Sequence, residues 1–279
     1  MQGRSAISRS AVFAANRAAG GVTFDVAGDA AGITRLRDVH EHGSLRVRFP
    51  NPEGKGLSGV LINTAGGVAG GDTFGVDVTA RTGASVTVTT AAAEKIYRSH
   101  GPDARINVTL NAGDNACLAW VPQETILFNH ARAARTFEID LAETATLLVC
   151  EIVVFGRTAM DEIMTAGRLV DRWRMRRGGK LVFAETIRLD GDIGAQLGKS
   201  AIAKGGVAIG TVLIAPGDAT VVARIRELEP SFGCEVGVSA WNGFAMVRFC
   251  AQDAARLRTD MIAVLAQANV VPLPRIWVQ

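Results

Sequence analysis

The segment Ala84-Ser85-Val86-Thr87-Val88-Thr89-Thr90 carries the clearest strand pattern of the sequence. Its valines alternate with hydroxyl-bearing residues, so that in an extended chain Val86 and Val88 point to one face and their neighbours point to the other. We therefore predict a strand here and expect its valine face to be buried.

Similar patterns recur along the whole chain. The 31 glycines separate segments rich in Val, Thr and Ile, an arrangement typical of many strands joined by tight turns. Further alternation occurs over residues 22–26, 44–49, 74–78, 105–110 and 137–141. No fixed-period repeat is present, but short strands can stack into a coil-like architecture without one. The leading fold class is mainly β.

The pair Gly178-Gly179 stands between two strand-like runs and predicts a two-residue hairpin turn, which requires positive φ angles. Counting across this turn predicts that one face is shared by Arg172, Arg174, Arg176, Leu181 and Phe183. A solvated face explains the arginines better than an anion-binding stripe, because no aromatic ladder accompanies them.

Helical spacing is clearest near the C-terminus, where Asp253 is a candidate cap. The apolar residues that recur at helical intervals after it are Leu257, Met261, Val264 and Leu265, and Pro272 and Pro274 end the pattern. A weaker pattern over residues 156–167 predicts a loop or a short helix.

Composition narrows the class of protein. With 279 residues, of which 48% are hydrophobic and 20% charged, the chain is expected to fold as one domain over residues 1–279, with residues 1–18 as a flexible tail. A net charge of +3 disfavours nucleic-acid binding. Since no apolar run approaches a membrane span or a signal peptide, we expect a cytoplasmic protein.

The chain has four cysteines and four histidines. The widely spaced Cys117, Cys150, Cys234 and Cys250 are expected to be buried, reduced thiols. Only His40-Glu41-His42 is a local histidine cluster. On a strand its two imidazoles point the same way and can hold nickel, copper or zinc, but a closed site needs three or four ligands. We expect no stable metal site.

The stretch Asn63-Thr64-Ala65-Gly66-Gly67-Val68-Ala69-Gly70-Gly71-Asp72 contains two glycine pairs and ends in a carboxylate. It lacks the spacing of a nucleotide-binding loop. Paired glycines permit close backbone approach and positive φ, and Asp72 is suited to accept backbone N–H groups in a turn.

The segment TTAAAEKIYRS, residues 89–99, has two readings. If it is extended, Lys95, Tyr97 and Ser99 share a face, and such groups serve proton transfer in enzymes. Alternatively, its small residues let a second backbone layer approach, which makes it a packed core strand with a polar end.

Two later segments place charges among apolar residues. In WVPQETILF, residues 120–128, Glu124 must be exposed, paired or protonated, because burying an unpaired charge costs several kcal/mol. In FGRTAMDE, residues 155–162, Arg157 can neutralise Asp161 or Glu162. His100 follows the KIYRS run, and His130 and Cys117 flank the PQET segment.

Taken in order, GGVAGGD, TTAAAEKIYRS, WVPQETILF and FGRTAMDE resemble the UreD family of urease accessory proteins, called UreH in some organisms. The segments SLRVRFP at residues 44–50 and LPRIW at residues 273–277 are similar to the ends of that family, so the resemblance covers nearly the whole chain. Asp161 departs from it, since the family commonly has Gly before the glutamate that matches Glu162.

The resemblance implies a helically stacked β fold with about two α-helices and a scaffold that is not an enzyme. Such a chaperone for nickel insertion would connect urease apoprotein to a UreF-type protein and, through it, to a UreG-type GTPase. Family membership also implies a water-filled route for nickel, with no tightly bound cofactor. The implied motif residues are Asp72, Lys95, Tyr97, Arg98, Ser99, Glu124, Arg157 and Glu162.

Within this set, Asp72, Glu124 and Glu162 are expected to line or shape the route, while Lys95, Tyr97 and Arg98 fix its walls by hydrogen bonds. These carboxylates, with His100 and His130, are candidates for transient nickel contacts, because a transfer route must bind weakly enough to release its ion. Two alternatives remain: an interaction scaffold without an ion route, and a small-molecule enzyme using Lys95 with Tyr97 or Glu124.

Overall fold

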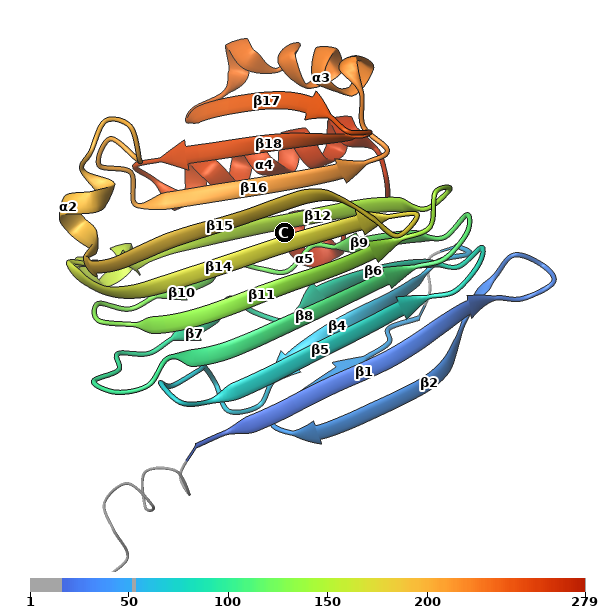
Figure 1. Cartoon of the computed structure of the whole chain (residues 1–279), viewed down its shortest axis with the longest axis horizontal. Coiled ribbons are helices and arrows are strands. Elements are labelled where there is room, and N and C mark those ends of the chain that lie inside the picture. Colours follow the sequence, from blue (N-terminus) through green and yellow to red (C-terminus); the bar gives the residue numbers. More distant parts are fainter. Residues whose placement is uncertain (1–16, 52–53, 279) are drawn as a thin grey trace, which may run out of the picture.

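A computed structural model describes residues 17–51 and 54–278 (Figure 1). Two β-sheets lie face to face, and helices cover the far side of one of them. A tail was predicted over residues 1–18, and residues 1–16 of it lie outside the described residues. Ala18 is held in place, because its N–H donates a 2.8 Å hydrogen bond to Oδ1 of Asp72.

We call the seven-stranded sheet sheet A. Its order is β15-β14-β11-β8-β5-β1-β2. The strands are β1 (Ala19–Gly28), β2 (Thr34–Gly43), β5 (Thr73–Ala80), β8 (Ala104–Ala112), β11 (Arg132–Leu141), β14 (Ala166–Arg177) and β15 (Lys180–Asp192). The run from β1 to β14 is parallel, whereas β2 and β15 are antiparallel strands at the two edges.

The facing sheet, sheet B, has the main order β17-β18-β16-β12-β9-β6-β4-β3. Its strands are β3 (Leu45–Arg48), β4 (Leu57–Asn63), β6 (Ser85–Thr90), β9 (Cys117–Trp120), β12 (Thr146–Arg157), β16 (Ala208–Ala215), β17 (Glu235–Trp241) and β18 (Phe244–Ala251). Three short strands lie beside this order: β7 (Glu94–Ile96), β10 (Thr125–Leu127) and β13 (Glu162–Ile163).

The chain coils between the two sheets. From β4 to β12 the main strands alternate, with β5, β8 and β11 in sheet A and β6, β9 and β12 in sheet B. Parallel neighbours cannot be joined by a tight turn, so each return to a sheet passes through the other one. This stacking confirms the predicted helically stacked β architecture.

The space between the sheets is filled by alternate residues of the strands, among them Phe24, Leu110 and Phe137. Val86 and Val88 of β6 belong to this core, as predicted. The opposite face of β6 is buried as well, since Thr87 and Thr89 are also inaccessible. The reason is that sheet B is covered on both sides, which one strand's alternation does not reveal.

Four α-helices lie within the described residues, more than the two or so that were predicted. They are α2 (Ile193–Leu197), α3 (Ala219–Arg226), α4 (Ala254–Ala268) and α5 (Arg275–Val278), accompanied by the 3₁₀ turns η1 (Thr158–Met160) and η2 (Glu229–Ser231). The extra helices are short, and runs of four to eight residues carry little periodic signal. No helix in the described part is long and apolar enough to cross a membrane.

The predicted C-terminal helix is confirmed in α4. Asp253 caps it by accepting a 2.8 Å hydrogen bond from the N–H of Ala255, and Asn269 ends it in the left-handed conformation. Leu257, Met261 and Val264 face a second core that they form with β16 and β18.

The predicted hairpin joins β14 to β15, and both of its glycines have positive φ angles, 54° and 76°. The prediction for Phe183 was wrong. A bulge after Met175 pairs Met175 with Phe183 and Arg176 with Leu181, so Phe183 lies buried on the side away from the arginines. Leu181 stays with Arg176 and is 54% exposed.

All four cysteines are free, but only Cys150 is fully buried. Burial raises its pKa well above the ordinary thiol value, which keeps the side chain protonated and unreactive. Cys117, Cys234 and Cys250 are partly accessible. The expectation of buried thiols therefore holds for one residue of the four.

Replacing Leu257 with alanine tests the packing of α4 on sheet B. The side chain is fully buried, so we expect Leu257→Ala to lower the free energy of unfolding by about 2–5 kcal/mol. Leu36→Ala, at a position of 37% exposure on β2, should change it by less than about 0.5 kcal/mol. Urea denaturation measures both, and equal losses would contradict the described packing.

Candidate functional site

The glycine-rich loop, residues 66–72, packs against the KIYRS run. The Tyr97 hydroxyl donates a 2.8 Å hydrogen bond to the carbonyl of Gly66. A Cβ atom at Gly67 would lie 2.5 Å from the Tyr97 ring, and one at Gly70 would lie 1.9 Å from Oγ of Ser99. The glycines therefore serve close approach, which joins the first two sequence motifs in space.

Asp72 holds this loop closed. Its side chain is buried, and Oδ2 accepts a 2.7 Å hydrogen bond from the N–H of Ala69 while Oδ1 accepts one from Ala18. Both carboxylate oxygens are thus used by backbone amides, the turn role that the sequence suggested for this residue.

A stack of side chains joins the third and fourth motifs to this loop. The Tyr97 and Phe128 rings meet edge to face, with centroids 5.2 Å apart. The guanidinium of Arg157 lies 4.2 Å from the centroid of Phe128 and donates hydrogen bonds of 2.8 and 2.9 Å to the carboxylate of Glu162. The hydrogen bonds from Arg157, assisted by the charge of Arg98, lower the pKa of Glu162.

The partner of Arg157 is therefore Glu162 and not Asp161. Asp161 has φ 53°, in the left-handed region that favours glycine and tolerates aspartate better than most residues. This backbone conformation explains why glycine is suited to the position. Within the predicted loop or short helix, residues 158–160 form the 3₁₀ turn η1, but the prediction missed the short strand β13 that follows it.

Glu124 is paired, one of the three states predicted for it. It accepts a 2.8 Å hydrogen bond from Arg258 of α4. Arg258 also lies 4.5 Å from the centroid of the Trp277 ring and donates to the carbonyl of Ile276. The third motif is thus tied to the C-terminal segment of the chain.

The remaining motif residues have different surroundings. Lys95, Arg98 and His100 are exposed, while His130 is half-buried with φ 65°. Oγ of Ser99 donates to the carbonyl of Pro102. No group of three or more His, Cys, Asp or Glu residues that could hold a metal ion occurs in the described part of the chain.

The alanines before Lys95 do not form a packed core strand, so this alternative from the sequence was wrong. β6 ends at Thr90, and the chain bends over residues 91–93 before β7 begins, leaving Ala91 and Ala92 exposed. These small residues instead line part of a cavity.

This cavity, of about 260 Å³, lies between the sheets. Its walls are mostly apolar, and its polar members are Asn63, Thr90, Glu94, Lys95, Gln123, Thr125 and Arg135. Burial raises the pKa of Glu94, which accepts a 3.1 Å hydrogen bond from Asn63. Gln123 is 8% exposed, and its Nε2 has no hydrogen-bond partner among the described residues.

A buried ionic cluster adjoins the cavity and was not singled out in the sequence. Arg135 of β11 contacts Glu151 of β12 and donates hydrogen bonds of 3.1 and 2.5 Å to Asp171 of β14. Trp120 donates a 2.7 Å hydrogen bond to Glu151. Burial raises the pKa of Glu151, whereas the two carboxylates outweigh burial and raise that of Arg135. The available signal was a lone acid in the apolar run LLVCEIVVF, residues 147–155.

Beyond Arg135 the polar groups continue. A narrow gap of about 10 Å³, room for roughly one water molecule, is lined by the ionic cluster together with Glu185, Thr211 and Arg248. Arg248 pairs with Glu185 and donates a 2.7 Å hydrogen bond to Thr211. Glu185 and Arg248 also line an open cleft of about 540 Å³ on the other side.

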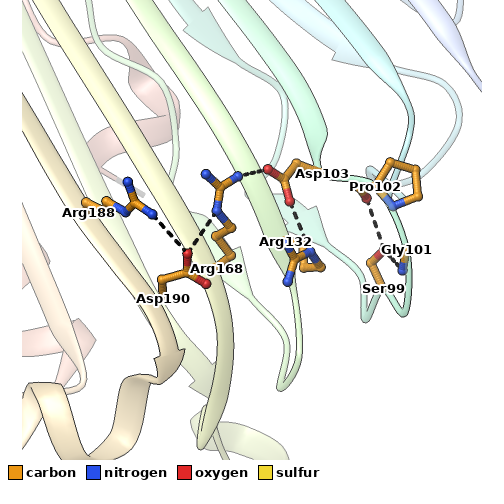
Figure 2. A network of polar contacts seen from close by, with 8 residues as sticks. All are labelled: Ser99, Gly101, Pro102, Asp103, Arg132, Arg168, Arg188 and Asp190. Carbon is orange, nitrogen blue, oxygen red and sulfur yellow. Dashed lines mark hydrogen bonds and ion pairs between the residues drawn. The ribbon is translucent and has the colours of Figure 1, made fainter.

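A second network, also missed in the sequence, links Ser99 to the edge of sheet A (Figure 2). After Pro102, Asp103 accepts hydrogen bonds from Arg132 and Arg168, and Asp190 accepts from Arg168 and Arg188. At this end of the sheet, Asp103 immediately precedes β8, Arg132 begins β11, Arg168 lies on β14, and Arg188 and Asp190 lie on β15. Sequence reasoning missed the contacts between strands because their partners are 22 to 65 residues apart along the chain.

Comparisons with known proteins identify the family of the chain. The family model described as "UreD urease accessory protein" matches residues 18–278. The chain is 63% identical over 277 residues to the urease accessory protein UreD of Rhodopseudomonas palustris strain HaA2, covering 99% of both chains. It is 64% identical over 269 residues to that of Bradyrhizobium diazoefficiens, covering 96% of both. These matches define the class, the urease accessory proteins. Within it, the chain belongs to the UreD family.

The close approach of the glycine loop can be tested by adding one methyl group. We expect Gly70→Ala to lower the free energy of unfolding by about 1–3 kcal/mol, because the new Cβ would overlap Ser99 and the carbonyl of Pro102. Gly75→Ala on β5 is the matched control, since a Cβ there meets nothing within 4 Å. Thermal unfolding compares them, and an unchanged Gly70 variant would contradict the described contact.

Proposed function

We propose that this chain connects urease apoprotein to a UreF-type accessory protein and a UreG-type GTPase, and guides nickel ions toward the urease active site. It acts as a metallochaperone-type scaffold in the cytoplasm and catalyses no reaction of its own. Membership of the UreD family supports the accessory role. The partners and the ion route are the parts that need testing.

One observation carries the route. The 260 Å³ cavity, the ionic cluster and the 540 Å³ cleft succeed one another through shared residues: Arg135 borders the cavity and the narrow gap, and Glu185 borders the gap and the cleft. A nickel ion moving along this line meets Glu94 first, then Glu151 and Asp171, then Glu185. It must give up most of its hydration shell at the gap, which has room for roughly one water molecule. The ion can travel in either direction without changing the chemistry.

The donor set suits passage of nickel more than its storage. Oxygen ligands hold nickel less firmly than imidazole or thiolate groups do, and each carboxylate of the cluster already has a hydrogen-bonded partner. One guanidinium faces two carboxylates, so the fully ionised cluster attracts a cation while Arg135 keeps that attraction weak.

Asp72, Glu124 and Glu162 shape this route from outside the cavity. Asp72 closes the loop whose residues Gly66 and Val68 line the cavity. Glu124 lies between Gln123 and Thr125, which also line it. Tyr97 fixes Gly66 by its hydrogen bond, and Arg157 fixes Glu162. Lys95 stands at the rim.

The first experiment measures urease activity in cells that contain apo-urease, the other accessory proteins and nickel, with and without this chain. We expect activity only when the chain is present. Co-purification with the urease apoprotein and with the UreF-type protein tests the bridge. Equal activity in both cultures would overturn the accessory function for this urease.

Variants separate a route from a scaffold without one. We expect Glu94→Gln, Asp72→Ala and Glu162→Ala to reduce activation several-fold at limiting nickel while the complex still assembles. Glu229→Gln is the control, because this carboxylate is 60% exposed and lies away from the cavity. If all three variants activate urease normally and their complexes are intact, the route is rejected. The alternative that then remains is an interaction scaffold without an ion route.

A further inference from the structure

The outer face of sheet A carries two histidines that the proposed function does not use. His40 and His42 occupy alternate positions of β2, where they pair with Thr23 and Gly21 of β1. Between them, Glu41 pairs with Val22, whose side chain is buried between the sheets. Directly paired residues point to the same side, so both imidazoles lie on the exposed outer face.

The two rings are close together and are not held by other side chains of the described residues. Their centroids lie 5.9 Å apart, and their planes differ by 34°. Neither imidazole has a hydrogen-bond or ion-pair partner in the part of the chain that the structure describes. In its neutral form each imidazole has one nitrogen with a free lone pair, so the two rings offer two nitrogens to a metal ion.

The neighbouring strands leave room around the rings. A Cβ at Gly21 would lie 2.1 Å from Cε1 of His42, so only glycine lets this ring rest over β1. The next residue in the same row is Gly75 of β5, where an added Cβ would meet nothing within 4 Å. A hydrated ion beside His42 would meet open surface on this side.

Carboxylates lie on the same face as the two rings. Asp38 of β2, Asp25 of β1 and Asp77 of β5 share the outer face, one register step or more from the rings. Asp25 pairs with Arg81, and Asp77 accepts a 3.4 Å hydrogen bond from Thr23. The exposed Arg37 lies next to Asp38 on β2, whereas Arg46 and Arg48 are paired with Glu41.

We propose that His40 and His42 chelate one divalent ion of the late first-row transition metals, such as Ni²⁺ or Cu²⁺, with water completing its coordination. Imidazole nitrogen suits these metals. Metal–nitrogen bonds of about 2.0–2.1 Å place a metal about 3 Å from each ring centre, so one ion spans rings up to about 6 Å apart. The observed separation of 5.9 Å lies within this reach, and exposed side chains can rotate to shorten it.

The site is distinct from the proposed nickel route. The route lies between the sheets, whereas these imidazoles lie on the opposite face of sheet A. Binding at His40 and His42 therefore does not depend on the proposed function, and it is measurable on the purified full-length chain without urease.

Cu²⁺ is the first probe, because its electron paramagnetic resonance spectrum reports the bound nitrogens. With less than one equivalent of Cu²⁺, we expect two imidazole nitrogens per ion in the unaltered chain and one in His40→Asn or His42→Asn. Each single variant should bind Cu²⁺ at least about tenfold more weakly, because the second imidazole acts at high effective concentration. The double variant should be little weaker than either single one.

Equilibrium dialysis against NiCl₂ supplies the second readout, in which the double variant should bind one equivalent less than the unaltered chain. Lys180→Asn is the control, since it changes an exposed residue of β15, at the opposite edge of sheet A from β2. Independent, additive losses in the two single variants would mean separate monodentate contacts. That result, or unchanged binding in the double variant, would overturn the chelate.

Discussion

The structure depends on a constraint of parallel pairing: two parallel neighbours cannot be joined by a tight turn. Because β5, β8, β11 and β14 are parallel, the chain must cross to sheet B between them, and it does so through β6, β9 and β12. The connections that lead from sheet B back to sheet A, which follow β6, β9 and β12, all lie at the same end of the stacked strands. Loops that are far apart in sequence, such as those containing Tyr97, Phe128 and Glu162, are therefore gathered there.

The gathered motifs are held by contacts of different kinds. Glycines permit the backbone approach at Tyr97 and Ser99, buried carboxylate oxygens of Asp72 satisfy backbone amides, and the Arg157–Glu162 pair extends an aromatic stack. Most of these groups fix other groups and do not themselves face the cavity. In the proposed route these groups would act through the shape of the cavity wall.

The interior between the sheets combines apolar packing with a line of buried charges. An ionic cluster such as Arg135, Glu151 and Asp171 contributes little net stability, because desolvation offsets most of the attraction. Removing a single member is costly, however, since it leaves an uncompensated charge. The cluster therefore contributes less to the stability of the fold than its number of charges suggests.

Local patterns in the sequence determined the strands, the hairpin at residues 178–179, the capped helix α4 and the family of the chain, because backbone periodicity and turn chemistry act over a few residues. The tertiary structure alone decided the burial of Thr87 and Thr89, the side to which Phe183 points, the pairing of Glu124 with Arg258, and the cluster around Arg135. These features arise where strands from distant parts of the chain meet. Register, bulges and the layer that covers each face set them, and none of these is encoded in the spacing along one strand.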